Sequence, residues 1–105
     1  MAQFSVYKNK NPATRSRYPL LVDIQSDLLD SLTTRVVVPL TKASAFGKKP
    51  IATLTPVVEV DGQKFAMLMP QLAAIAAKDL GSMVGTVAHH RSDIVAAVDF
   101  LITGI

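Results

Sequence analysis

Residues 55–68 read TPVVEVDGQKFAML, and this stretch carries the clearest local structural signal in the chain. Apolar, mostly β-branched residues precede Asp61 and Gly62, and further apolar residues follow them. An Asp-Gly pair accepts the positive φ angles of a two-residue type I′ turn. The stretch therefore predicts a β-hairpin that turns at Asp61 and Gly62.

Three segments before this hairpin predict further strands. Residues 3–7 alternate polar and apolar side chains, and residues 18–24 resume an apolar pattern after a polar loop. Residues 35–40, RVVVPL, form a β-branched run that is typical of a central strand. Because Pro39 has no N–H to donate to a strand ladder, we expect it to mark the end of that strand.

Apolar residues at helical spacing predict that the last element is a helix. We expect Ser92 to cap its start and Gly104 to end it in a left-handed conformation. Its apolar residues fall on two faces, with Ile94, Val98, Leu101 and Ile105 on the first and Val95 and Ile102 on the second. A helix that is apolar nearly all round is buried on more than one side. The last residues are therefore expected to be held by the protein's own core or by a partner.

The composition is that of one globular domain, residues 1–105, with 50% hydrophobic and 18% charged residues. Several short strands followed by one helix predict a small β-barrel or sandwich with an appended helix. The chain has no cysteine, which excludes disulfides and thiolate metal sites. There is no basic-then-apolar leader and no apolar run of the ~20 residues that a membrane span needs. We expect a soluble, cytoplasmic protein that does not bind membranes.

No residue pattern in the chain matches a known catalytic or metal-binding motif. His89 and His90 are adjacent, so their side chains diverge and do not favour joint metal binding. Ser26 is not in a nucleophile elbow, and a turn hydroxyl explains it better. There is no phosphate-binding or dinucleotide-binding glycine loop. These observations favour a binding domain that is not an enzyme, with no cofactor and no metal.

Three segments taken together resemble the CcdB family of toxins from bacterial toxin–antitoxin modules. They are residues 3–7 (QFSVY), residues 22–30 continuing through 35–40 (VDIQSDLLD and RVVVPL), and the terminal helix with Gly104 and Ile105 as its last residues. The resemblance implies an SH3-like small β-barrel, mainly β, with an additional small antiparallel sheet and one C-terminal α-helix. It also implies a non-enzymatic homodimer that binds the A subunit of DNA gyrase, traps the gyrase–DNA cleavage complex and blocks religation. A disordered segment of a cognate antitoxin would neutralise it, and only the toxin–antitoxin complex would bind DNA, to repress its own operon.

The resemblance also implies which residues contact these two partners. Those facing gyrase would be Ile105, Gly104, Thr103, Ile102, Asp99, Ser26, Leu28 and Leu29, with the last three beside the helix. An acidic, extended antitoxin peptide would suit the basic residues of two loops, namely Lys8, Lys10, Arg15, Arg17, Lys42 and Lys48.

Two departures from the family pattern leave alternatives open. Thr103 stands where the family often has an aromatic residue, so stacking or cation–π energy of ~0.5–2 kcal/mol would be absent. A non-toxic homologue that binds antitoxin as an antagonist is therefore one alternative. The segment 72–77 is alanine-rich and helical by propensity, yet it aligns with a family strand, and we expect tertiary context to make it a strand.

A second alternative is a messenger-RNA-cleaving toxin of the same SH3-like fold. General acid–base cleavage would need a poised base and a cation that stabilises the anion. Arg35 near Asp23 or Ser26 is the best set that the sequence offers.

Overall fold

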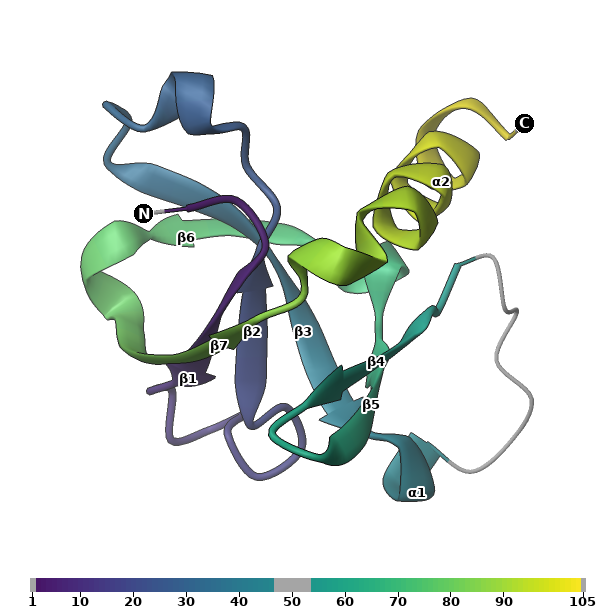
Figure 1. The fold of residues 1–105 in the computed structure, drawn as a ribbon. Coiled ribbons are helices and arrows are strands. Elements are labelled where there is room, and N and C mark those ends of the chain that lie inside the picture. Colours follow the sequence, from purple (N-terminus) through teal and green to yellow (C-terminus); the bar gives the residue numbers. More distant parts are fainter. Residues whose placement is uncertain (1, 47–53, 105) are drawn as a thin grey trace.

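The structure, a computed structural model, describes residues 2–46 and 54–104 (Figure 1). The strands in this part of the chain are β1 (Ser5–Asn9), β2 (Leu20–Asp23), β3 (Thr34–Lys42), β4 (Val57–Val60), β5 (Gln63–Met67), β6 (Ala73–Ala76) and β7 (Leu80–Thr86). The helices are α1 (Ala43–Phe46) and α2 (Arg91–Thr103), with single 3₁₀ turns η1 (Asp27–Leu29), η2 (Met69–Gln71), η3 (Ala77–Asp79) and η4 (Ala88–His90). The expected mainly β class with one C-terminal helix is confirmed. Neither α-helix within the described ranges has the length and apolar character needed to cross a bilayer.

All strand pairs are antiparallel, and they form one curled sheet in the order β4-β5-β3-β2-β1-β7. β3 is the central strand, as its β-branched run predicts. Its first half, residues 34–37, pairs with β6, and its last residues, 40–42, pair with β5. β6 therefore branches from β3 and supplies the small additional antiparallel pairing that was expected.

Pro39 lies inside β3, so the expectation that it ends the strand is wrong. Its carbonyl accepts a hydrogen bond from the Leu68 N–H at 3.0 Å. In an extended strand the nitrogen and the carbonyl of one residue face the same neighbour. On the side of β3 that Pro39 faces, the neighbouring strand changes from β6 to β5. Residue 39 lies at this change of partner, so no strand there requires a hydrogen bond from its nitrogen.

The β4–β5 hairpin and the strand at residues 73–76 are both confirmed. Asp61 and Gly62 have φ angles of 56° and 79°, as a type I′ turn requires, and Val60 pairs with Gln63 across the turn. The segment after η2 is strand β6 because β3 offers it a ladder of four residue pairs. Backbone pairing to a central strand outweighs the helical propensity of three alanines.

The start of α2 differs from the expectation that Ser92 caps it. The helix begins at Arg91, directly after the 3₁₀ turn η4, so the chain is already helical before Ser92. The side-chain acceptor at this entrance is Thr86, whose hydroxyl accepts from the Ala88 N–H at 3.1 Å.

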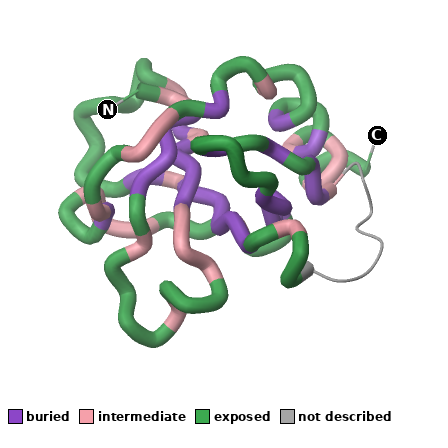
Figure 2. The backbone as a smooth tube through the Cα atoms, turned by 60° about the horizontal axis from the view of Figure 1, so that its bottom comes forward, coloured by how far each residue is buried: buried purple, intermediate pink, exposed green. Residues whose placement is uncertain are grey.

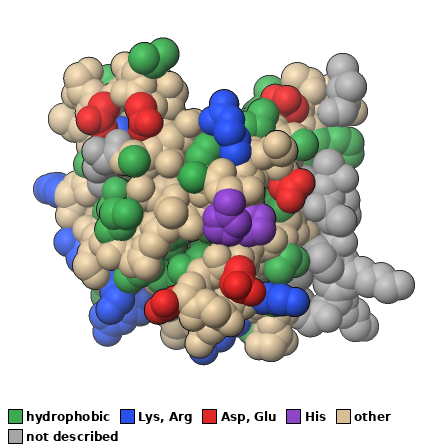
Figure 3. Space-filling model, viewed as in Figure 1, with side chains coloured by type: hydrophobic (Ala, Val, Ile, Leu, Met, Phe, Trp, Pro, Cys, Tyr) green, Lys and Arg blue, Asp and Glu red, His purple; other side chains and the backbone are tan. Residues whose placement is uncertain are grey.

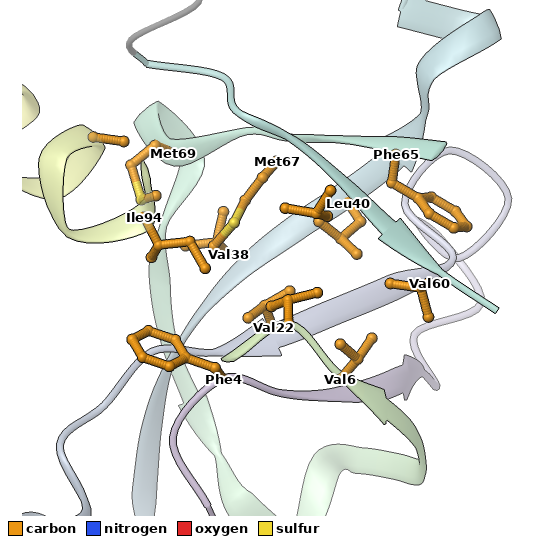
Figure 4. Close-up of a cluster of buried hydrophobic side chains, with 13 residues drawn as sticks. Phe4, Val6, Val22, Val38, Leu40, Val60, Phe65, Met67, Met69 and Ile94 are labelled. Carbon is orange, nitrogen blue, oxygen red and sulfur yellow. The ribbon is translucent and has the colours of Figure 1, made fainter. Parts of the chain in front are cut away.

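The main core lies between the curled strands and is closed at one end by α2 (Figure 4). Its buried members are Phe4, Val6, Val22, Val38, Leu40, Val58, Val60, Phe65, Met67, Met69, Val87, Ile94 and Ala97. A smaller cluster of Tyr7, Leu21, Val37 and Leu80 lies on the other side of the sheet. Figure 2 shows that the buried backbone follows the strands, whereas the connecting loops are exposed.

Candidate partner-binding surfaces

Helix α2 packs one side onto the core and leaves apolar side chains exposed on another. Ile94 is buried, and Val98 and Leu101 pack against the core cluster, as the helical spacing predicts. Val95 and Ile102 expose 39% and 71% of their surface. Val95 and Ile102 are seven residues apart, so they share one face of the helix.

The end of α2 is built as the sequence predicts. Gly104 has a φ of 75° and its N–H donates to the Phe100 carbonyl at 2.9 Å, which closes the helix in a left-handed cap. The Thr103 hydroxyl donates to the Asp99 carbonyl at 2.6 Å, so this side chain is turned back along its own helix. Ile105 lies outside the described residues.

The loop around η1 presents a second group of exposed leucines. Leu28 exposes 94% of its surface, and Leu29 and Leu32 are also exposed. The Ser26 hydroxyl accepts from the Leu28 N–H at 3.2 Å, which confirms a role in the turn. Sequence reasoning missed Leu32, although it continues the apolar series three residues after Leu29.

Hydrogen bonds from buried residues hold this loop in place. The side chain of Gln25 donates to the Leu29 carbonyl at 3.1 Å and accepts from the Val36 N–H at 3.1 Å. Arg35 reaches Asp30 with an Nη1–Oδ1 distance of 3.0 Å. The exposed leucines therefore lie on a loop that hydrogen bonds and an ion pair hold in place.

In a single chain the η1 loop does not lie beside the end of α2. Figure 1 shows the two segments apart, at opposite ends of one side of the molecule, and Figure 3 shows them as separate projections. Gln3 joins the η1 loop to the start of α2, not to its end: its backbone N–H donates to Asp27 Oδ1 at 2.7 Å, and its side chain accepts from Nη1 of Arg91, the first residue of the helix, at 3.4 Å. The expectation that Ser26, Leu28 and Leu29 lie beside the helix end is therefore wrong for one chain, because the helix runs from Arg91 away from this loop.

Arg35 and Asp23, the pair considered for RNA cleavage, are brought together but buried. Arg35 Nε donates to Asp23 Oδ2 at 2.8 Å, and Nη2 lies 2.7 Å from the same oxygen without hydrogen-bond geometry. Both residues are at most 1% exposed. A phosphate cannot reach this pair without opening the loop above it, so it is a structural ion pair in this conformation.

The structure separates the basic residues that were expected to form one antitoxin surface. Lys8 and Lys42 line a cleft of about 270 Å³ together with Leu20, Phe65 and Val84. Lys10 instead lines a larger cleft of about 630 Å³ and donates to the Lys78 carbonyl at 3.0 Å.

The other basic residues lie elsewhere. Arg15 and Arg17 lie on the turn at residues 12–17, and Lys48 is outside the described residues. Most Lys and Arg side chains visible in Figure 3 lie along the lower and left edges of the face, away from α2.

The two histidines have tilted rings, with centroids 4.2 Å apart. The buried Nε2 of His90 has no hydrogen-bond partner among the residues that the structure describes. In the described ranges, no three residues among His, Asp and Glu are grouped closely enough to hold a metal ion.

A family model described as CcdB protein matches residues 3–104. Among solved structures, the chain is similar to a mycobacterial endoribonuclease in complex with its cognate antitoxin, at 14% identity and a TM-score of 0.76 over 97% of this chain and 94% of that chain. It is also similar to a mycobacterial endoribonuclease at 15% identity and a TM-score of 0.70, over 97% of this chain and 90% of that chain. At these identities the structural likeness shows the shared fold alone.

Proposed function

The chain belongs to the CcdB family and is a toxin of a toxin–antitoxin module, and on this premise we propose that it binds the A subunit of DNA gyrase and blocks religation of the cleaved DNA. The observation that carries the proposal is the exposure of two aliphatic side chains on one face of α2, Val95 and Ile102, the second at the end of the helix. The exposed Asp99 lies between them. No other described segment covers this face, so it is accessible to a large partner.

The chemistry of the end of α2 supports its insertion into the surface of a partner protein. Full burial of a side chain such as Ile102 contributes about 1.5–3 kcal/mol. No atom of the described residues, apart from the chain neighbours of Gly104, lies within 4 Å of where a Cβ would be at this position, so a partner's backbone can approach it closely. Asp99 is exposed near Ile102 and supplies a carboxylate for a basic residue of the partner.

The remaining parts of the proposal follow from family membership. The active toxin is a homodimer in the cytoplasm, whose two helix ends are related by a two-fold axis and act together. It is not an enzyme. A cognate antitoxin neutralises it, and the pair represses its own operon, so DNA is bound only by the complex.

RNA cleavage is the competing function, and the fold of the mycobacterial endoribonucleases raises it. Fold similarity alone does not transfer an activity. The best catalytic set in the sequence is Arg35 with Asp23. In the structure these two residues are buried and form an ion pair with each other. We therefore treat RNA cleavage as an outcome of the test below.

The test is a gyrase cleavage assay with supercoiled plasmid and ATP. We expect the intact protein to accumulate linear DNA, and versions that lack Ile105 or carry Ile102→Asp to lose this activity. The matched control is Val57→Asp, because Val57 is an exposed valine on β4, away from α2. This control is expected to behave as the intact protein does.

Three outcomes contradict the proposal. If the folded intact protein gives no linear DNA while a control poison does, gyrase is not its target. Site-specific cleavage of added RNA would then favour the ribonuclease function. Absence of both activities, with antitoxin binding retained, would favour the antagonist function.

A further inference from the structure

The pairing of β2 with β3 is only half made at its last residues, Ile24 and Val36, where the chain leaves β2 for the η1 loop (Figure 1). The Ile24 N–H donates to the Val36 carbonyl at 3.0 Å. In a regular antiparallel ladder the Val36 N–H would donate back to the Ile24 carbonyl. It donates instead to the side chain of Gln25 at 3.1 Å, and the Ile24 carbonyl accepts from the side chain of Gln3 at 3.1 Å. Two glutamine side chains therefore complete the ladder in place of backbone groups.

Gln25 is buried and uses both ends of its amide. Its Oε1 accepts from the Val36 N–H, and its Nε2 donates to the Leu29 carbonyl at 3.1 Å. A glutamine amide supplies a donor and an acceptor from one uncharged group. The backbone N–H of Gln25 donates to the buried Asp23 Oδ1 at 3.0 Å. The side chain therefore connects the two central strands to the η1 loop.

The carbonyl that Gln25 holds lies in the middle of the exposed leucines. The Leu29 carbonyl also accepts from the Leu32 N–H at 3.1 Å. Leu28 exposes 94% of its surface, so packing does not hold this side chain. Its direction depends on the backbone of the loop, which the bond from Gln25 to Leu29 fixes.

We infer that Gln25 is a positioning residue for partner binding, because its buried amide holds the η1 loop in the one arrangement in which Leu28 and Leu29 contact gyrase. The inference rests on the proposed function, since gyrase is the partner that these leucines would contact. It goes beyond that function, because Gln25 is 7% exposed and acts through the leucines. A loop that is already ordered loses less conformational entropy when it binds.

Closure of the sheet does not by itself require the Gln25 amide. Without this side chain, the Val36 N–H and the Ile24 carbonyl can bond to each other, as they do in a regular ladder. The Leu29 carbonyl has no such replacement within the sheet. Replacement of Gln25 is therefore expected to affect the loop more than the strands.

The first test uses the unmodified full chain. Hydrogen exchange of the glutamine side-chain amides, followed by NMR, compares Gln25 with Gln63, which is exposed on β5. Because only an opening of the loop exposes the Gln25 amide, we expect its protons to exchange at least about tenfold more slowly than those of Gln63. Equal rates for the two side chains would overturn the inference.

The second test replaces Gln25 by Met, which has a similar size and no amide. The backbone amides of Leu29 and Leu32 are expected to exchange about tenfold faster, whereas the amide of the core residue Val38 keeps its rate. Gln63→Met is the matched control and should leave all three rates unchanged. If Gln25→Met does not fold, Gln25→Asn, whose amide is one methylene shorter, serves for the same measurement. Unchanged exchange in the loop of the folded variant would overturn the inference.

A third test asks whether Gln25 acts through the leucines. Gln25→Met is introduced into the intact protein and into a variant with both Leu28→Ser and Leu29→Ser. In the intact protein it should raise the concentration that gives half-maximal linear DNA by about threefold to tenfold, and in the leucine variant by less than about twofold. Equal factors in the two backgrounds would show a general effect on the fold and would overturn the inference.

These measurements separate the inference from the gyrase proposal. If the intact protein does not poison gyrase, whereas the Gln25 amide is protected and Gln25→Met frees the loop, only the gyrase proposal fails. If gyrase poisoning is intact and Gln25→Met leaves loop exchange unchanged, only the role of Gln25 fails.

Discussion

Arg35 and Asp23 form an ion pair in the interior of the protein, with Arg35 Nε 2.8 Å from Asp23 Oδ2 and at most 1% exposure of either residue. The second carboxylate oxygen of Asp23 accepts the Gln25 N–H at 3.0 Å. This network joins β2, β3 and the loop that carries the exposed leucines. It therefore links the stability of the sheet to the position of a candidate partner-binding segment.

Replacement of Asp23 by Ala is expected to destabilise the fold strongly. It leaves the Arg35 charge buried with only the half-exposed Asp30 as an ionic partner, and the loss of one member of a buried pair costs about 3–5 kcal/mol. The free energy of unfolding can be measured by urea denaturation. Asp30→Ala is the control, and we expect it to cost less than about 2 kcal/mol, because water screens an exposed carboxylate. Equal losses for the two variants would show that Asp23 has no special role.

Replacement of Gly81 by Ala is expected to destabilise the protein by about 1–3 kcal/mol, the usual cost of forcing an extra carbon into a packed position. The new Cβ would lie 2.7 Å from the Lys8 carbonyl oxygen. Gly85 on the same strand is the matched control, since its nearest neighbour would be Val60 Cγ1 at 3.6 Å, an ordinary contact. The pairing of β1 with β7 shifts between Tyr7, which pairs with Met83, and Asn9, which pairs with Leu80, so two residues of β7 oppose Lys8 in a β-bulge. Thermal unfolding of both variants tests whether this bulge needs a glycine at position 81. A Gly85→Ala variant that is as unstable as Gly81→Ala would contradict this account.

Replacement of Thr103 by Trp is expected to strengthen gyrase poisoning. An aromatic ring at this exposed position could stack on a partner side chain or a cation, which is worth about 0.5–2 kcal/mol, or roughly twofold to thirtyfold in affinity. Thr103→Val removes only the hydroxyl that donates to the Asp99 carbonyl. The concentration of each variant that gives half-maximal linear DNA should therefore fall for Trp and change little for Val. No difference between Trp and Val would place residue 103 outside the interface.

Replacement of Leu28 by Ser tests whether the η1 loop takes part in gyrase binding. Leu28 exposes 94% of its surface, so its loss is expected to change the free energy of unfolding by less than about 0.5 kcal/mol. We expect linear-DNA formation to fall nonetheless. Leu32→Ser, in the same loop but outside the set that the family resemblance implies, is the control. Full poisoning by the Leu28 variant would restrict the gyrase surface to α2.

Local chemistry made several elements predictable. Asp61 and Gly62 accept the backbone angles of the hairpin turn without help from distant residues. Gly104 likewise accepts the left-handed cap. The spacing of Ile94, Val98 and Leu101 placed one face of α2 on the core, because a helix repeats every 3.6 residues in any context.

Expectations failed where a residue's role depends on its neighbours in space. Pro39 was expected to end β3. It lies inside the strand because β3 pairs with β6 before this residue and with β5 after it, so neither pairing requires an N–H at residue 39. Ser92 was expected to cap α2, but the turn η4 begins the helical path earlier. The leucines of the η1 loop were expected beside the helix end, but the loop is joined through Gln3 to Arg91 at the start of α2, and the helix runs away from it.

The sequence by itself determined the turn, the helix face, the mainly β class and the family, since these depend on local backbone preferences and on the order of motifs along the chain. The tertiary structure alone made residues 73–76 a strand, buried the Arg35–Asp23 pair, and brought Lys8 and Lys42 to one cleft. These features arise from contacts between residues far apart in the sequence. Such contacts form only when the sheet curls, and no local pattern encodes which residues the curl brings together.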